Sequence, residues 1–164
     1  MMYYLGIDPG KAGGLAIINK WSVAQHEYTH VYVTAMLWAG KTVDILGVAD
    51  WIENIVVDMD DFVAYIEKVG AMPKQGVTSM FNFGFSTGMI HGMLRSWGVP
   101  LHEVRPQDWK KDILHGTAKD KAAAADFCRR VYPEVNLLAT ERSKKPHSGI
   151  SDALCIARYA TLNY

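Results

Sequence analysis

The sequence contains very little cysteine, and several other familiar signals are missing from it. Cys128 and Cys155 are the only two cysteines among 164 residues, and they stand far apart in apolar helical contexts. Buried free thiols are therefore expected rather than a disulfide or a metal-binding pair, and no zinc-site spacing is present. The chain has no signal-peptide pattern and no apolar run long enough to span a bilayer, which predicts a cytoplasmic protein without a membrane partner.

Internal repeats, low-complexity tracts and linkers are also absent. Apolar residues make up 49% of the chain, which suffices for one sizeable core, so we expect residues 1–164 to form a single domain. The net charge is zero but unevenly distributed: residues 1–104 carry six Lys and Arg against ten Asp and Glu, whereas residues 105–147 carry ten against six. A basic half of this kind suits a phosphate-rich partner, although solvated helix faces produce the same pattern.

The first expected strand is an apolar run that ends in a carboxylate. Residues 2–7 are almost entirely apolar, Asp8 follows them, and Pro9-Gly10 then breaks the strand. A carboxylate at the end of a buried strand costs desolvation free energy unless a cation, an amide or another charge compensates it. Two interpretations of Asp8 stay open: an Asx hydrogen bond that caps the turn, or a ligand for a cation.

Glu67 holds the same position on a second expected strand. Residues 62–66 form a continuous apolar run, which is typical of a strand buried on both faces of a mostly parallel sheet. Ligands gather at the carboxyl ends of such strands, so Asp8 and Glu67 brought to one edge would form a cation site. The alternative is that Glu67 pairs with Lys68 or another surface cation.

The remaining elements follow from hydrophobic periodicity. We expect strands at 14–18, 31–36 and 101–104, helices at 43–57 and 76–97, a short basic helix from 105, a helix after 117 and a last helix from 150.

Three glycines spaced four residues apart mark the helix at 76–97. Gly84, Gly88 and Gly92 each cost about 1 kcal/mol relative to alanine, which predicts close packing of this stripe on the sheet or on a second subunit. The nearby aromatic residues are expected in the core, although one could be a stacking residue; they are Phe81, Phe83 and Phe85.

Two lysines lie in or directly after a segment that resembles the start of a helix. Residues 117–120 resemble a capping box, which would place Lys119 and Lys121 in a first helical turn. The helix dipole disfavours cations there, so a phosphate between the two lysines would explain their position. The alternative is that both are merely exposed and weakly penalised.

Asp152 is the third isolated acid. The helix expected from Ile150 places it in the first turn, where a carboxylate is favourable by itself. If Asp8, Glu67 and Asp152 instead converge, they make a divalent-metal cluster, in which two Mg²⁺ ions about 4 Å apart activate a water and stabilise the leaving oxygen of phosphodiester hydrolysis.

A series of short motifs is spread along almost the whole chain. They are Gly6-Ile7-Asp8-Pro9-Gly10, Ile66-Glu67-Lys68, Ala71-Met72-Pro73 with Gln75-Gly76-Val77, Arg105-Pro106 with Trp109-Lys110-Lys111, Lys119-Asp120-Lys121, and Ser151-Asp152-Ala153. In this combination the chain resembles the RuvC family of Holliday junction resolvases, most of all its bacteriophage and organelle branch. The resemblance implies an α/β, ribonuclease H-like fold with a mixed five-stranded sheet flanked by helices on both faces, and a homodimer that acts on four-way DNA.

The resemblance also implies roles for single residues. Asp8, Glu67 and Asp152 would bind two metal ions, Mg²⁺ or alternatively Mn²⁺, and Lys119 or Lys121 would hold or polarise the scissile phosphate.

This chain departs from the family at the position of the fourth metal ligand. Family members usually carry Asp, Glu or His three or four residues before the last acid, where this sequence has Gly149 and Ser148. We expect His147, five residues before Asp152, to reach the second metal ion and to shuttle a proton. The alternatives are weak coordination by Ser148 through water, or an impaired site.

The function predicted from these observations is that of a Mg²⁺-dependent crossover junction endodeoxyribonuclease. It would resolve Holliday junctions and other branched DNA by symmetric phosphodiester hydrolysis, in the host cytoplasm if a phage encodes it. The alternative is a catalytically impaired module of the same fold that binds branched DNA. A phosphotransferase of the actin and sugar-kinase fold would need two such domains and far more residues than this chain has.

Overall fold

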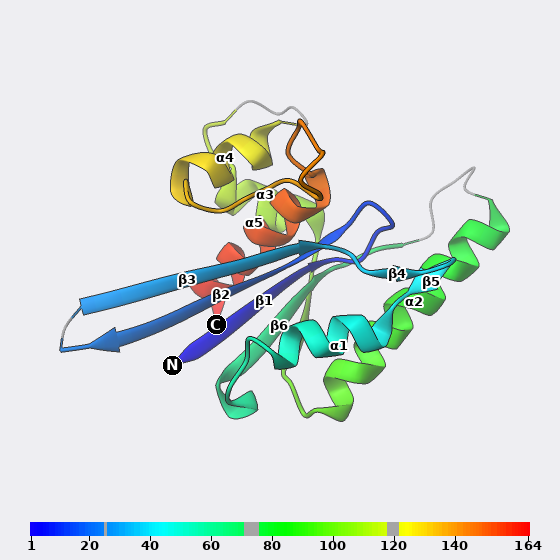
Figure 1. Cartoon of the computed structure of the whole chain (residues 1–164), viewed down its shortest axis with the longest axis horizontal. Helices are drawn as coiled ribbons and strands as arrows, with labels where there is room; N and C mark the ends of the chain where they lie inside the picture. The colour runs from blue at the N-terminus through cyan, green and yellow to red at the C-terminus, as the bar shows by residue number, and fades with distance from the viewer. Residues whose placement is uncertain (25, 71–75, 118–121) are drawn as a thin grey trace.

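A mixed five-stranded sheet forms the centre of the computed structural model, which describes residues 1–24, 26–70, 76–117 and 122–164. Its strand order is β3-β2-β1-β6-β7 (Figure 1). The strands are β1 (Met2–Asp8), β2 (Gly14–Val23), β3 (His26–Ala35), β6 (Phe62–Glu67) and β7 (Leu101–Val104). Strand β1 pairs antiparallel with β2 and parallel with β6, so it lies at the middle of the sheet. A short hairpin, β4 (Trp38–Ala39) and β5 (Thr42–Val43), lies beside it.

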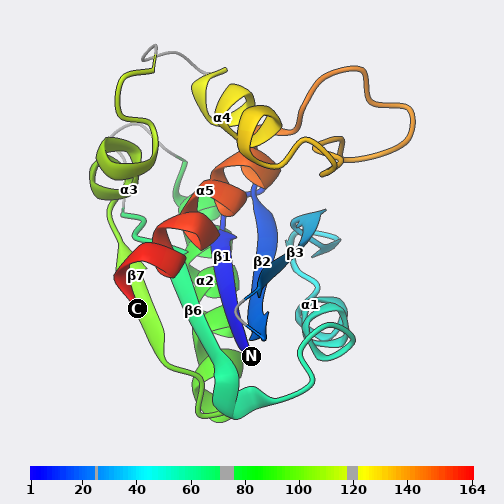
Figure 2. The same ribbon diagram turned by 90° about the vertical axis from the view of Figure 1, so that its left-hand side faces the viewer.

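Helices cover both faces of this sheet (Figure 2). One face carries α3 (Pro106–Ile113), α4 (Ala123–Val131) and α5 (Ser148–Asn163), and the other carries α1 (Ile45–Glu53) and α2 (Val77–Ser96). A short 3-10 helix, η1 (Met59–Asp61), precedes β6. Side chains alternate across a strand, so Ala16 and Ile18 enter the core under α5 whereas Leu15 and Ile17 enter the core under α1 and α2. The predicted α/β architecture, with a mixed five-stranded sheet and helices on both faces, is therefore confirmed. None of the described helices combines the length and the apolar character needed to cross a membrane.

The hairpin of β2 and β3 is longer than the strands predicted at 14–18 and 31–36. Each strand has ten residues, and the extra length carries aromatic side chains in place of core residues. Trp21 stacks on Tyr28 across the hairpin at 5.4 Å between ring centroids and meets His30 edge-on at 4.7 Å. Such cross-strand pairs stabilise strand ends that bury little surface. Periodicity could not show them because polar residues interrupt the alternation.

Helix α1 is shorter than the amphipathic run at 43–57. It begins at Ile45 because the Asp44 side chain accepts a hydrogen bond from the Gly47 amide at 3.1 Å, as an N-cap does. It ends at Glu53, yet Ile55 and Val56 still pack on the core. The apolar pattern in the sequence therefore continues past the end of the helix, because the last buried residues lie beyond the last helical residue.

The glycine stripe of α2 does not pack on the sheet. This helix buries Ser86, Ile90 and Leu94, and a Cβ atom added at Gly84, Gly88 or Gly92 would meet nothing within 4 Å. Packing of these glycines on the sheet is therefore a wrong prediction, whereas contact with a second subunit stays a prediction.

The aromatic residues near the start of α2 correct a second expectation. Phe81 is 70% exposed and Phe85 is 51% exposed, so neither belongs to the core, and only Phe83 is half-buried. The two exposed rings lie 6.3 Å apart in stacked orientation. They share their side of the helix with the glycines, so α2 presents an apolar, glycine-rich surface to solvent.

Candidate active site

Two of the three predicted acids lie at the same edge of the sheet. Asp8 is the last residue of β1, and Glu67 is the last residue of β6. Because these strands are parallel neighbours with Ile7 opposite Ile66, the residues that follow reach the carboxyl edge side by side. The alternative partner for Glu67 is not used, since Lys68 forms its ion pair with Glu103, at 3.5 Å.

Glycines let α5 bring Asp152 to this edge. A Cβ atom at Gly6 in β1 would collide with the backbone of Ala153 and Ala157, so α5 rests directly on the strand. At the helix start, Gly149 forms a parallel bridge with Gly13 of the turn after β1. This close approach requires glycine, and it brings the first turns of α5 beside Asp8.

The same contact explains the missing acid at position 149. A Cβ atom there would collide with the carbonyl oxygen of Ala12 and with the backbone of Gly13. This backbone arrangement therefore excludes any side chain at Gly149. Ser148 is exposed and is the only one of the two upstream positions with room for a ligand.

The three carboxylates influence one another's ionisation. Burial, the negative charge of Asp8 and that of Glu67 raise the pKa of Asp152 to about 6, although Lys110 opposes them. Burial also raises the pKa of Asp8, against the effects of the Gly10 amide and of Lys110. For Glu67, burial and the charge of Asp8 raise the pKa, while Trp109 and Lys110 lower it. The edge of the sheet thus holds more negative charge than its surroundings balance.

Asp8 forms the turn-capping bond that the sequence offered as one interpretation, and its role as a ligand for a cation stays a prediction. Its Oδ1 accepts a hydrogen bond from the Gly10 amide at 3.2 Å, which is the Asx bond of the turn. The same carboxylate is the acid that raises the pKa of both Glu67 and Asp152. The capping bond therefore orients Asp8 within the cluster.

Lys110 and Trp109 are the site residues that sequence reasoning missed. The charge of Lys110 lowers the pKa of Asp8, Glu67 and Asp152, so among the described residues its ammonium group acts on all three acids. Trp109 donates a hydrogen bond from Nε1 to Glu67 Oε2 at 2.8 Å. Both residues occurred in the motif that resembles RuvC, but a basic helical segment also suits a solvated face.

His147 caps the helix that carries Asp152. Its Nδ1 accepts a hydrogen bond from the Ile150 amide at 3.3 Å, and α5 begins at Ser148. Asp152 therefore lies beyond the first turn, and the prediction of a first-turn position is wrong because the histidine cap extends the helix by two residues. The role of His147 as a metal ligand stays a prediction, for which its Nε2 is the remaining ring nitrogen.

The two predicted lysines, Lys119 and Lys121, lie outside the described residues. The described helix α4 begins at Ala123, later than the capping box at 117–120 predicts. The two cysteines of α4 and α5, by contrast, confirm the expectation of buried free thiols. Cys128 Sγ and Cys155 Sγ lie 3.8 Å apart, which their separation in the sequence could not show.

The donor chemistry of this edge fits a divalent cation. Carboxylate oxygens are the ligands that Mg²⁺ prefers, and a cation would relieve the repulsion that raises the pKa of Asp152. Within the described residues, no three acidic, histidine or cysteine side chains lie together in an arrangement that could hold a metal ion by themselves, so a bound cation would have to draw the three acids closer together.

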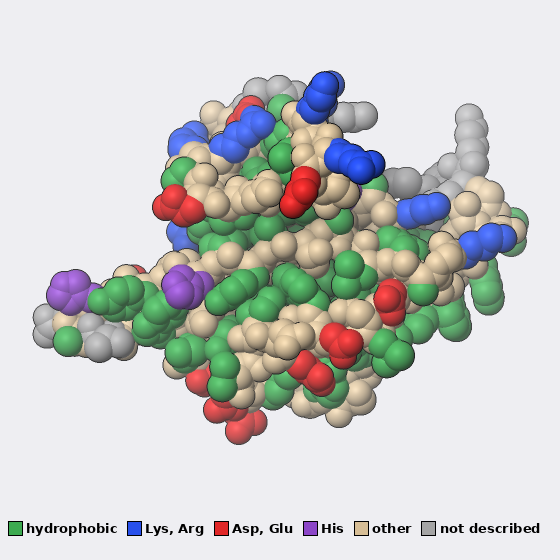
Figure 3. Space-filling view, viewed as in Figure 1, with side chains coloured by type: hydrophobic (Ala, Val, Ile, Leu, Met, Phe, Trp, Pro, Cys, Tyr) green, Lys and Arg blue, Asp and Glu red, His purple; other side chains and the backbone are tan. Residues whose placement is uncertain are grey.

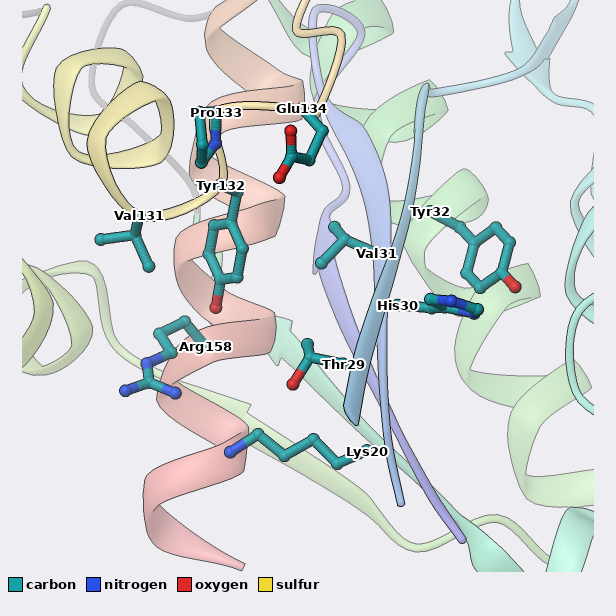
Figure 4. A pocket seen from close by; sticks show the side chains of 10 residues that line it. All are labelled: Lys20, Thr29, His30, Val31, Tyr32, Val131, Tyr132, Pro133, Glu134 and Arg158. Atoms are coloured by element: carbon teal, nitrogen blue, oxygen red, sulfur yellow. The ribbon is translucent and has the colours of Figure 1, made fainter. Parts of the chain in front are cut away.

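A cavity lies away from the three acids. A pocket of about 660 Å³ lies between β2, β3, the end of α4 and α5, and Lys20, Thr29 and Arg158 face into it (Figure 4). Lys20 pairs with Met2, whereas Asp8 pairs with Gly14, so the pocket and the acids lie toward opposite ends of β1.

Basic side chains gather on one part of the surface. Figure 3 shows Lys and Arg over α4 and the loop before α5, with some Asp and Glu among them and further Lys and Arg at the right of the view, whereas the α1 side carries Asp and Glu. The exposed cations of this region are Arg129, Arg130, Arg142, Lys144 and Lys145. The charge asymmetry of the sequence therefore becomes a spatial one.

This arrangement defines a class of protein: an α/β protein of the ribonuclease H-like fold with an acidic cluster at the carboxyl edge of its sheet. Comparison with solved structures leads to the particular fold, that of RuvC. RuvC of Thermus thermophilus in complex with Holliday junction substrate is similar with a TM-score of 0.62 and 19% identity, over 99% of this chain and 97% of that one. A second Thermus thermophilus RuvC structure is similar with a TM-score of 0.61 and 19% identity, over the same shares.

Sequence comparison adds little to this likeness. No family model matches the chain. A curated isoleucine–tRNA ligase of Latilactobacillus sakei subsp. sakei (strain 23K) is 32% identical over 93 residues, which are 56% of this chain and 10% of that protein. The chain thus spans about a tenth of the length of that relative.

Proposed function

We propose that this chain is a metal-dependent endonuclease that resolves Holliday junctions and other branched DNA. The observation that carries the proposal is the meeting of Asp8, Glu67 and Asp152 at one edge of a RuvC-like sheet, where their pKa values are raised together. The structural neighbour was solved with a Holliday junction substrate, which supports branched DNA as the substrate class.

The chain's own residues divide the chemistry between them. Asp8, Glu67 and Asp152 would hold two Mg²⁺ or Mn²⁺ ions, which when bound activate a water and stabilise the leaving oxygen of the phosphodiester. Lys110 carries the positive charge that already influences all three acids, and it would contact the non-bridging oxygens of the scissile phosphate. His147, at the start of α5, would complete the second metal site or move a proton there.

The substrate interface would combine the basic surface with a twofold axis. Arg129, Arg130 and the loop cations before α5 supply phosphate contacts, so binding weakens steeply as salt rises. The exposed surface of α2, with Phe81, Phe85 and the glycine stripe, would be the homodimer interface. A twofold-symmetric dimer matches a twofold-symmetric four-way junction and places two active sites on symmetric strands.

A second candidate function has one specific observation in its favour. Position 149 has no room for the acid that the family usually carries near this place. A chain that lacks the fourth ligand would bind branched DNA without cutting it.

The deciding experiment compares a synthetic four-way junction with its linear duplex. Each is incubated with Mg²⁺, Mn²⁺ or chelator, and with the wild type or Asp8→Asn. The nuclease predicts paired symmetric nicks in the junction alone, which are lost with chelator and in Asp8→Asn. Tight junction binding without cleavage under any metal would instead establish the binding module, and no preference for the junction would refute both.

A further inference from the structure

Trp109 contacts two charged groups of the acidic edge at once. Its side chain is fully buried, its Nε1 donates to Glu67 Oε2 at 2.8 Å, and the ammonium of Lys110 lies 5.0 Å from the centre of its ring. The edge of the indole therefore faces an acid, and its face meets the neighbouring cation.

The packing around Trp109 fixes both contacts. The ring belongs to the core between the sheet, α3, α4 and α5, and α3 is anchored at its start by Pro106 and by the ion pair of Arg105 with Asp108 at 2.8 Å. A long carboxylate such as Glu67 has several rotamers, and one hydrogen bond from a fixed donor selects among them. Its other oxygen, Oε1, has no hydrogen bond from the residues that the structure describes, which leaves it to a ligand.

Simple satisfaction of a buried polar group does not account for this bond. Indole N–H groups usually find a partner when buried, but Trp38 in the opposite core keeps a buried Nε1 that has no hydrogen-bond partner among the described residues. Within the part of the chain that the structure describes, the indole N–H of Trp38 is thus left unpaired, while that of Trp109 is directed at Glu67.

We propose that Trp109 is a positioning residue of the active site, which orients Glu67 through its indole N–H and holds Lys110 against the three acids with its ring. The inference rests on the proposed function in one respect, namely that Glu67 is a metal ligand. Partners that orient a ligand in this way typically change metal affinity by about 10- to 100-fold when they are removed.

The test compares the same substitution, tryptophan to phenylalanine, at two positions. Trp109→Phe removes the N–H donor and keeps an aromatic face for Lys110, and Trp38→Phe removes an indole N–H for which the described residues supply no partner. Binding of Mn²⁺ to the DNA-free protein is measured by electron paramagnetic resonance, and junction cleavage is measured across a range of Mg²⁺ concentrations. We expect Trp109→Phe to bind Mn²⁺ about 10-fold or more weakly, with cleavage restored by excess Mg²⁺, and Trp38→Phe to behave as wild type.

A third variant separates the two contacts of the ring. Trp109→Leu removes the donor and the aromatic face together, so at saturating Mg²⁺ its maximal cleavage rate should fall below that of Trp109→Phe. Equal maximal rates would overturn the part of the proposal that concerns Lys110. Unchanged Mn²⁺ affinity in Trp109→Phe, or cleavage that excess metal does not restore, would overturn the part that concerns Glu67.

A measurement on the wild type covers the case in which the variants do not fold. In a ¹⁵N-labelled sample, Mg²⁺ should shift the indole N–H resonance of Trp109 and leave that of Trp38 unchanged; a Trp109 resonance that does not respond to Mg²⁺ would overturn the proposal. If the wild type itself binds no Mn²⁺ and cuts no junction, the proposed function fails. If the wild type does both and Trp109→Phe matches it, only the positioning role fails.

Discussion

Asp152→Asn should stabilise this protein at neutral pH while abolishing cleavage. The acid is half-buried and lies within the influence of the charges of Asp8 and Glu67, which together raise its pKa from 3.8 to about 6. An ionised carboxylate in this place therefore costs free energy that the unfolded chain does not pay. Each pKa unit corresponds to about 1.36 kcal/mol, so the shift amounts to about 3 kcal/mol at neutral pH.

The sign of the pH dependence follows from the direction of the shift. Below the unfolded pKa of 3.8 the carboxyl group is neutral in both states, and the cost is absent. Between pH 3.8 and about 6 the folded protein keeps a proton that the unfolded chain has lost, so stability falls as pH rises. Above about pH 6 the cost stays constant. The difference between Asp152→Asn and wild type should therefore grow from about 0.6 kcal/mol at pH 4 to about 3 kcal/mol at pH 7.5.

Urea unfolding in chelator, repeated from pH 4 to pH 8, measures this difference. For a chain of this size about 3 kcal/mol corresponds to a rise in melting temperature of about 6–12 °C. Asp50→Asn, an exposed acid on α1, is the matched control and should show no such trend. A gain in Asp152→Asn that does not vary with pH would refute the electrostatic reasoning. Added Mg²⁺ should stabilise wild type more than Asp152→Asn, since the ion compensates the same charge.

Three further predictions concern packing, assembly and the DNA interface. Gly149→Ala should destabilise the fold by about 1–3 kcal/mol in urea unfolding, because its Cβ meets backbone, whereas Gly88→Ala on the open face of α2 should stabilise the helix by up to about 1 kcal/mol; equal effects would contradict the packing described. Phe81→Glu should convert a dimer into a monomer in light scattering without loss of stability, since this side chain is 70% exposed; an unchanged mass would remove α2 as the interface. Replacing Arg129 and Arg130 by Gln should lower the salt dependence of junction binding by about 0.9 per lost phosphate contact, and an unchanged slope would place the DNA elsewhere.

Much of the fold was predictable because it depends on patterns local to the chain. The apolar run at 62–66 and the break after Asp8 identify the two central strands, and parallel strands bring their ends to one edge whatever the loops do. Two acids of the site could therefore be named from the sequence. Asp152 could be named as well, but the helical turn in which it lies could not be predicted. The reason is that the ring of His147 caps α5 and so sets where the helix begins.

The contacts between distant elements could not be predicted in this way. Lys110 and Trp109 belong to a basic helix that looks solvated in sequence, and only the packing of α3 against α5 in the core turns the indole toward Glu67. The exposure of Phe81 has the same origin, because which side of an apolar helix faces the sheet is decided by the sheet.

By itself the sequence determined the order of the strands and helices and the two acids at strand ends, because hydrophobic periodicity and chain-breaking residues act within a few residues. Only the tertiary structure decided that α5 lies on Gly6, that position 149 must be glycine, and that Trp109 and Lys110 join the acids. These features depend on close approach between segments that are far apart in the chain. A pattern among neighbouring residues carries no information about which distant segments meet.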